Sequence, residues 1–174
     1  KYTELNWTIF RPSLIFGDPR GNNRPEFCTQ LKKDMLGLPI PAPNFHKGLN
    51  PLDAGKFAMS PINVKDVASF FVKSIDMEAS FKKTYHLGGV AYYWKDIIQT
   101  IAKAYGKNKW TIPAPAIAIQ IVASLLGRFS WFPISKDQLT MLVEGNVCES
   151  DKTFELFKIE PTPFNTETLN YLNN

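Results

Sequence analysis

The sequence predicts an α/β fold with two or three short strands and about six helices. A run of strand-forming residues at 7–16 ends in the dense turn signal GDPRG. Several later segments carry apolar residues every three to four positions, as expected for one face of a helix. The hydrophobic content of 44% over 174 residues is enough for a globular core and too high for a disordered chain.

The first predicted strand, residues 7–16, contains Pro12 in its interior. Proline has no backbone N–H, so Pro12 marks the point where pairing with a neighbouring strand stops. We expect the backbone groups of residues 13–15 to be free for another partner. Two interpretations stay open. Either this is a plain strand end at which Arg11 bonds to backbone carbonyls, or it borders a ligand, because open α/β sheets bind ligands beyond the carboxyl ends of their strands.

The segment after the turn predicts a helix over residues 25–37. Pro25 suits a first helical turn, apolar residues recur at positions 27, 31 and 35, and Gly37 can end the helix. Residues 38–55 then contain four prolines and predict a long irregular loop. Loops of this length inside a compact domain are usually functional or mobile.

The rest of the chain alternates between extended pieces and helices. Extended pieces are predicted at 56–64, 83–89 and 110–115. Helices are predicted at 64–77, 92–106, 116–129 and 135–145, followed by a short one before Ile159 and a last one from about Thr166. Two of these helices have a clear apolar face, made of Val67, Phe70, Phe71 and Ile75 in one and of Trp94, Ile97, Ile98, Ile101 and Tyr105 in the other.

Composition argues against several classes of function. The net charge is +4, but the lysines are scattered. Two interpretations stay open: a solvated surface with no nucleic-acid partner, which we expect, or a weak patch for nucleic acid or an anionic membrane. Cys28 and Cys148 are too few for a disulfide framework, which favours a reducing, cytoplasmic compartment. The only histidines, His46 and His86, have no cluster of ligands around them, so we expect no metal site.

No motif assigns a catalytic residue. The sequence lacks GxGxxG, a P-loop and GxSxG, and we expect no acid–base pair of the Tyr-x-x-x-Lys type. His46, in the long loop, is either incidental or faces a pocket. The first residues carry no signal-peptide pattern and no initiator Met, so we expect this chain to be a fragment.

The segment from Pro113 to Phe129 contains an uncharged run, Pro115 to Gly127. A helix over this stretch would be about 20 Å long, too short to cross about 30 Å of bilayer hydrocarbon. We expect a buried helix or lid, or a segment that contacts a partner protein or a membrane surface, leaving the protein cytoplasmic or membrane-associated.

Three stretches together resemble a known family. They are LNWTIFRPSLIFG, MSPINVKDVASFFVKSI and KTYHLGGVAYYWKDIIQTIAKAYGK. They look like the C-terminal half of the extended and atypical short-chain dehydrogenase/reductase superfamily, which includes NAD-dependent epimerases and dehydratases. The later FPISKDQLTMLVEGN and FKIEPTPFNTETLNYL are similar to the branch of the complex I 39 kDa subunit-like proteins.

The resemblance implies the mostly helical, substrate-side part of a Rossmann-type NAD(P)-binding fold. Residues 1–174 would form one C-terminal domain, with the last Rossmann-type strand and turn in 1–21 and the mostly helical part in 22–174. The Gly-rich cofactor loop and the catalytic Tyr and Lys would precede this chain.

The resemblance also implies where the sites lie. The cofactor-binding residues that it carries over are Pro12, Ser13, Leu14 and Ile15, whose backbone would lie beside the nicotinamide of NAD or NADP. The substrate-side residues that it suggests are Arg11, Phe16, His46 and Phe57. The helix at 25–37 and the segment 113–129 would also wall the substrate side, and the substrate would be a small molecule.

Two functions follow from the resemblance. The parent protein is expected to be an NAD(P)-dependent oxidoreductase, or a nucleotide-sugar epimerase or dehydratase relative. The alternative is a non-catalytic NAD(P)H-binding assembly subunit of the NADH dehydrogenase (complex I) type. In either case we expect this fragment alone to be inactive and not to bind the cofactor.

Overall fold

A computed structural model describes residues 4–21, 24–37, 39–48, 50–119, 121, 140 and 142–173. The predicted α/β class is confirmed: short strands, mostly in parallel pairs, alternate with helices. The strands are β1 (Thr8–Pro12), β2 (Ile15–Phe16), β3 (Ala42–His46), β4 (Ala58–Met59), β5 (Ile62–Asn63), β6 (Lys83–Leu87), β7 (Tyr92–Tyr93) and β8 (Thr111–Pro115). The α-helices are α1 (Phe27–Leu31), which continues as a π-helix over Lys32–Leu36, α2 (Val64–Ser74), α3 (Trp94–Ala104) and α6 (Asp151–Phe157). Short 3-10 turns cover Pro51–Asp53, Glu78–Ser80 and Asn170–Asn173.

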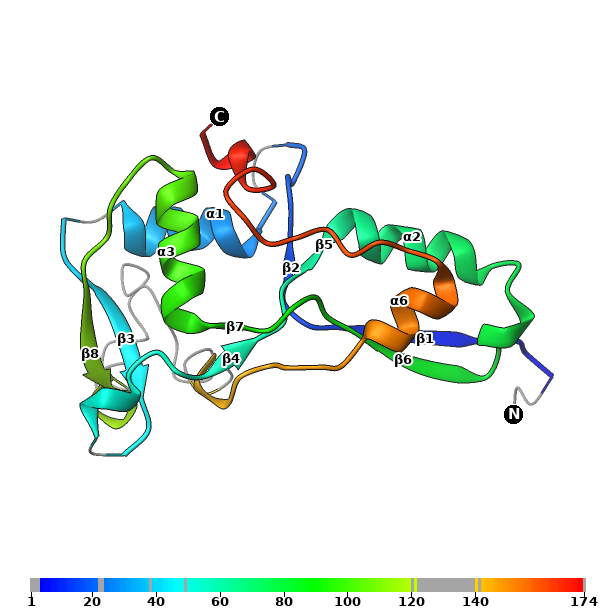
Figure 1. Cartoon of the computed structure of the whole chain (residues 1–174), viewed down its shortest axis with the longest axis horizontal. Coiled ribbons are helices and arrows are strands. Elements are labelled where there is room, and N and C mark those ends of the chain that lie inside the picture. Colours follow the sequence, from blue (N-terminus) through cyan, green and yellow to red (C-terminus); the bar gives the residue numbers. More distant parts are fainter. Residues whose placement is uncertain are drawn as a thin grey trace.

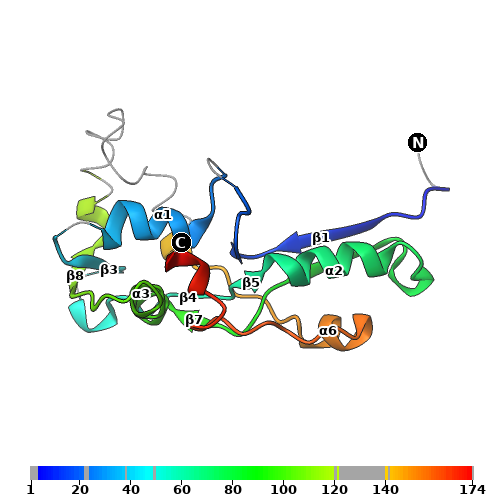
Figure 2. The same cartoon turned by 90° about the horizontal axis from the view of Figure 1, so that it is seen from above.

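The molecule is elongated, with one group of elements at each end of its long axis (Figure 1). At one end β1 and β6 form a parallel pair next to α2 and α6, and at the other β3 and β8 form a parallel pair next to α1 and α3. The short pairs β2–β5, parallel, and β4–β7, antiparallel, lie between them. Figure 2 shows the same sequence of elements along this axis from above.

The predicted single strand at 7–16 is two strands in two different sheets. β1 pairs with β6 from Thr8, opposite Lys83, to Pro12, opposite Leu87, and the next amide, Ser13 N, still donates to Leu87 O (2.7 Å). The chain then turns toward β5, where Ile15 lies opposite Ile62. Because Ser13 bonds to Leu87, the backbone nitrogen of Pro12 faces away from β6, and its missing N–H takes no bond from this ladder, contrary to the expectation that Pro12 stops the pairing.

The prediction of an irregular loop at 38–55 was wrong in part, because this segment contains β3. Pro43 within the strand and Pro41 just before it made the sequence look unlike a strand. Pro43 is compatible with the strand because its carbonyl accepts a hydrogen bond from Trp94 Nε1 (3.1 Å), on the edge away from β8. The missing N–H of Pro43 therefore removes no bond from the β3–β8 ladder.

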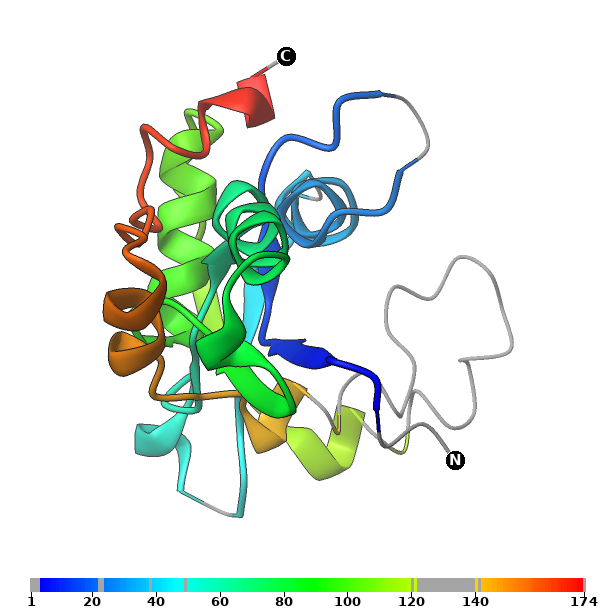
Figure 3. The same ribbon diagram turned by 90° about the vertical axis from the view of Figure 1, so that its right-hand side faces the viewer.

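Two apolar clusters make up the core. The larger one surrounds α3. Of the predicted stripe, Trp94, Ile97, Ile98 and Ile101 are fully buried in it, and Tyr105 is only half-buried. The smaller one joins α2, β1, β6 and α6, which lie close together when the molecule is viewed along its long axis (Figure 3).

The predicted apolar face of α2 is only half correct. Val67 and Phe70 are buried, whereas Phe71 is 53% exposed and Ile75 is 70% exposed. The helix turns Phe70 toward Phe154 and Phe157 of α6. The half-exposed Phe71 packs edge-on against Phe10, with ring centroids 5.1 Å apart, and Ile75 lies open to solvent. α2 therefore keeps a partly uncovered apolar face.

The C-terminal segment ties the two ends together. It runs from α6 back past α2 to the region of α1 and α3 (Figures 1 and 2). On the way Phe164 packs edge-on against Phe16, with ring centroids 5.0 Å apart. Near its end the Tyr171 hydroxyl donates to Glu26 Oε1 (3.1 Å), and the same carboxylate accepts from the first amides of α1.

Asp66 is expected to hold this returning segment in place. The buried Asp66 carboxylate accepts hydrogen bonds from Thr162 N (2.8 Å) and Thr162 Oγ1 (2.7 Å). Since hydrogen bonds to a charged group are worth about 1.5–3 kcal/mol, Asp66→Ala should lower the free energy of unfolding by about 2 kcal/mol in urea titrations. The matched control is Asp96→Ala, at the same first-turn position of α3 but exposed, for which about 0.5 kcal/mol is expected. Equal losses in the two variants would contradict the role given to Asp66.

Candidate functional site

The carboxyl ends of β1 and β6 are the first part of the candidate site. Here the backbone groups predicted to be free are largely used within the chain. Ser13 N donates to Leu87 O (2.7 Å), and Leu14 O accepts from Ile62 N (2.8 Å). Ser13 N thus still bonds to the end of β6, whereas Leu14 O finds its partner in β5, which lies beside the chain as it leaves β1. Within the described residues the N–H of Leu14 has no acceptor, so it is the group at this edge that a ligand can use.

Residues 146–150 cross the carboxyl ends of both strands. The carbonyl of Asn146 accepts from Ser13 Oγ (3.0 Å) and from Ser60 N (2.8 Å). Ser150 Oγ accepts from Gly88 N (2.8 Å) and donates to the carbonyl of His86 (2.9 Å). This segment was missed in the sequence, because it has neither periodicity nor a motif and its contacts lie more than 60 residues away.

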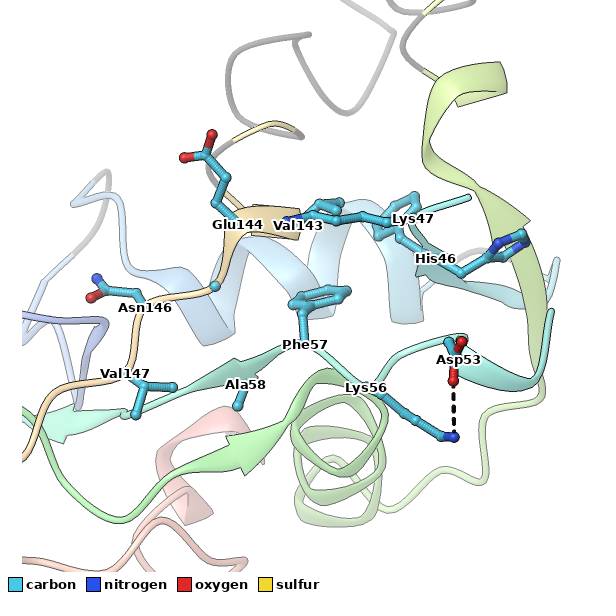
Figure 4. A pocket seen from close by; sticks show the side chains of 12 residues that line it. His46, Lys47, Asp53, Lys56, Phe57, Ala58, Val143, Glu144, Asn146 and Val147 are labelled. Atoms are coloured by element: carbon cyan, nitrogen blue, oxygen red, sulfur yellow. Dashed lines mark hydrogen bonds and ion pairs between the residues drawn. The ribbon is translucent and has the colours of Figure 1, made fainter. Parts of the chain in front are cut away.

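A cavity of about 670 Å³ adjoins this segment. His46 and Phe57, both suggested from the sequence, line it, together with Lys47, Lys56 and Asn146 among others. Figure 4 shows the Phe57 ring between residues 144–147 on one side and His46 and Asp53 on the other. Because Asn146 lines the cavity and also bonds to Ser13, the cavity is joined to the end of β1.

The cavity combines an aromatic wall with charged side chains. Phe57 stacks on the buried Trp94 with ring centroids 5.6 Å apart, and Phe45, which also lines the cavity, packs on the same indole. Lys56 Nζ lies 3.2 Å from Asp53 Oδ1 (Figure 4). His46 is buried, and its Nδ1 lies 3.1 Å from the carbonyl of Gly48. Such a site suits a small polar molecule with a flat or apolar part.

Arg11 and Phe16 do not line this cavity. Arg11 is exposed on β1 opposite His86. Phe16 is fully buried, because its ring packs against Phe164. Both belong to the larger core cluster, as does Leu169. The structure thus brings His46 and Phe57 together and leaves the other two apart from them.

The expectation that no Tyr and Lys are spaced four apart was wrong, because Tyr105 and Lys109 have this spacing. They do not share a helical face: α3 ends at Ala104, Tyr105 is its C-cap and Gly106 has a φ of +70°. The Tyr105 ring lies 4.9 Å from Lys107 Nζ, and Lys109 Nζ lies 3.5 Å from the carbonyl of Leu36. α3 begins at the cavity, since Trp94 N donates to Phe57 O, so Tyr105 is about 16 Å from it. We therefore assign this pair no role in acid–base chemistry at the site.

Two segments that the sequence predicts to be helical lie only partly within the described residues. Of the segment 113–129, residues 120 and 122–129 lie outside the described part, as do 135–139 and 141 of the helix expected at 135–145. In the described part of 113–129, Ile117 and Ile121 are exposed, whereas Ile119 packs against the larger core cluster. Among the described residues, no group of three or more His, Cys, Asp or Glu could hold a metal ion. In the same residues, no helix is long and apolar enough to cross a bilayer.

Comparison with known proteins identifies the fold. No family model matches the chain. Over 106 residues it is 26% identical to the photosystem II assembly factor Ycf39 of Synechocystis sp.. The match covers 58% of this chain and 32% of that protein.

Solved structures match over nearly the whole chain. One is the UDP-glucose 4-epimerase of Thermus thermophilus in complex with NAD, with a TM-score of 0.62 and 15% identity over 98% of this chain and 46% of that one. Another is the UDP-glucuronic acid 4-epimerase of Bacillus cereus in complex with UDP-glucuronic acid and NAD, with a TM-score of 0.61 and 18% identity over 99% of this chain and 46% of that one. The chain therefore has the fold of part of these Rossmann-like epimerases, and it spans about half their length.

Proposed function

We propose that this chain is the substrate-side part of an NAD(P)-binding protein of the short-chain dehydrogenase and epimerase type. The observation that carries the proposal is the junction of two features. The parallel pair β1–β6 ends at Pro12, and an aromatic, polar cavity adjoins that end through Asn146. Ligands of open α/β sheets bind beyond the carboxyl ends of their strands. The likeness in fold to two epimerases that were solved with NAD supports the choice of cofactor.

The free edge of β1 supports a larger sheet. Within the described residues β1 pairs only with β6. Ile9 in β1, and Leu5 and Trp7 just before it, expose large apolar side chains. An unpaired edge with apolar residues is unusual, because it invites pairing with another strand. We propose that upstream residues of a longer polypeptide pair with this edge and carry the phosphate-binding loop.

At the site, this chain would position the cofactor and the substrate. The N–H of Leu14 would donate to the nicotinamide carboxamide, while Pro12, Ser13 and Ile15 would border the ring. When bound, the nicotinamide supplies hydride chemistry. The cavity with His46 and Phe57 would hold the small-molecule substrate and exclude water from it. No residue here is proposed as the acid or base, and in an active parent those groups would be the upstream Tyr and Lys.

A second candidate is a non-catalytic NAD(P)H-binding assembly subunit, as in the complex I type. The likeness to Ycf39, a protein named as an assembly factor, favours it. The two candidates differ in the upstream sequence: an enzyme requires a Tyr-x-x-x-Lys pair on a helix there, and an assembly subunit does not. If the longer polypeptide is active and loses its activity when that Tyr is replaced by Phe, the result would favour the enzyme over the assembly subunit.

Calorimetric titration with NADH and NADPH tests the cofactor. We expect the longer polypeptide to bind one of them with a Kd in the micromolar range, or about −8 kcal/mol. Residues 1–174 alone should bind neither at about 1 mM, because the phosphate-binding loop supplies much of the affinity. Micromolar binding by residues 1–174 would contradict the proposed division of the site, and no binding by the longer polypeptide would contradict the proposed function.

A further inference from the structure

A second cavity of about 530 Å³ lies at the opposite end of β3 from the first, where the segments around Pro39–Pro41 and 107–110 meet. These two segments link α1 to β3 and α3 to β8, at the same end of the molecule (Figure 1). We call this cavity the lysine groove. The residues that define it are Pro39, Ile40, Pro41, Lys107, Lys109 and Trp110.

The lysine groove concentrates positive charge. It is lined by Lys107 and Lys109 and, among the described residues, by no Asp or Glu. Burial, and then repulsion by Lys107, lowers the pKa of Lys109. Lys107 and Lys32 both lie over the Tyr105 ring, at 4.9 and 4.4 Å from its centroid. An anion in the groove would relieve the repulsion between these ammonium groups.

The groove also exposes large apolar side chains. Trp110 is 81% exposed and Ile40 is 59% exposed. Ile112, two residues after Trp110, is 50% exposed. An indole and isoleucines in the open, bordered by lysines, are unfavourable in water alone. They match the boundary between lipid headgroups and acyl chains, where indole rings and lysines are both enriched.

We propose that the lysine groove and the exposed Trp110 dock this protein on a membrane surface that contains anionic lipids. The lysines would face lipid phosphates, and Trp110 with Ile40 would enter the headgroup layer. A lipid surface fits better than an extended peptide, because Pro39 and Pro41 at the rim have no N–H to pair with a peptide backbone. Binding would be peripheral and reversible.

Co-sedimentation of the full polypeptide with vesicles tests this proposal. One set of vesicles contains phosphatidylcholine with 30% phosphatidylglycerol, a composition chosen on the order of that in anionic membranes, and the other contains phosphatidylcholine alone. Binding is expected only to the anionic set. Lys107→Glu with Lys109→Glu should weaken it at least about 25-fold, since each lysine near an anionic surface is worth about fivefold. Trp110→Ala should weaken it about tenfold.

Matched controls separate the groove from general charge and apolar surface. Lys82→Glu with Lys83→Glu makes the same charge change on other exposed lysines, and Leu52→Ala shortens another exposed apolar side chain. Both should change binding less than twofold. Circular dichroism confirms that each variant is folded. Three results would overturn the proposal. They are equally strong binding to neutral and anionic vesicles, equal losses of binding in the control variants, and no binding to either set of vesicles. Saturable binding of an acidic peptide at the groove with no binding to vesicles would also overturn it.

Discussion

Replacing Trp94 with alanine is expected to lower the free energy of unfolding by about 3–5 kcal/mol. The indole is 1% exposed at the start of α3 and is surrounded by the rings of Phe27, Phe45 and Phe57. Its Nε1–H also donates to the carbonyl of Pro43 in β3. Alanine would leave a cavity and an unbonded carbonyl. It would also remove the support of Phe57, the aromatic wall of the candidate site.

Urea denaturation of Trp94→Ala, Trp94→Phe and Trp7→Ala measures this effect. Trp94→Phe keeps most of the packing but loses the N–H donor, so it should cost about 1–3 kcal/mol. Trp7→Ala removes a partly exposed indole and should cost less than about 1 kcal/mol. A loss for Trp94→Ala no larger than that for Trp7→Ala would contradict the central place of this indole in the core.

Replacing Gly89 with alanine is expected to destabilise the protein by about 3 kcal/mol, or to prevent folding. Gly89 follows β6, and a Cβ added there would meet the carbonyl oxygen of Pro61. The two backbones approach closely because Gly89 N donates to the same oxygen (3.1 Å). The contact is with backbone, which cannot move aside as a side chain can. The segment just before β5 and the segment just after β6 would therefore have to separate.

Gly106→Ala is the matched control for Gly89→Ala. Gly106 has a φ of +70°, but nothing lies within 4 Å of an added Cβ. Only backbone strain is expected there, at about 1 kcal/mol. Thermal unfolding of both variants compares the two causes. If Gly106→Ala were as costly as Gly89→Ala, close approach would not explain the glycine after β6.

Local patterns in the sequence were sufficient for much of the fold. The spacing of Trp94, Ile97, Ile98 and Ile101 predicted α3 and its buried face, because both depend on helical periodicity alone. The expected effect of Pro12 on pairing was wrong, because Ser13 N still bonds to Leu87 O and only the three-dimensional register shows that the nitrogen of Pro12 faces the other edge. β3 was missed because proline normally excludes a strand, and only its partner β8, almost 70 residues later, shows that the edge at Pro43 is free of ladder bonds.

The candidate site was less predictable, because long-range contacts build it. His46 and Phe57 could be named from the sequence, and the structure places both in one cavity. The opposite wall, residues 143–147, comes from a distant segment with no local signal. The free amide expected at Ser13 is bonded to Leu87, and Leu14 keeps the unpaired N–H instead. Periodicity cannot reveal which amide of a turning chain meets a neighbouring strand.

Amide hydrogen exchange in the longer polypeptide, measured with and without saturating NADH, tests the central claim most directly. Peptides that cover residues 13–16 report on the N–H of Leu14, which has no acceptor within the described residues. We predict that NADH slows exchange in these peptides and leaves exchange at Lys107 and Lys109, in the lysine groove, unchanged. Saturation by NADH with unchanged exchange at residues 13–16 would contradict the claim that the end of β1 borders the nicotinamide.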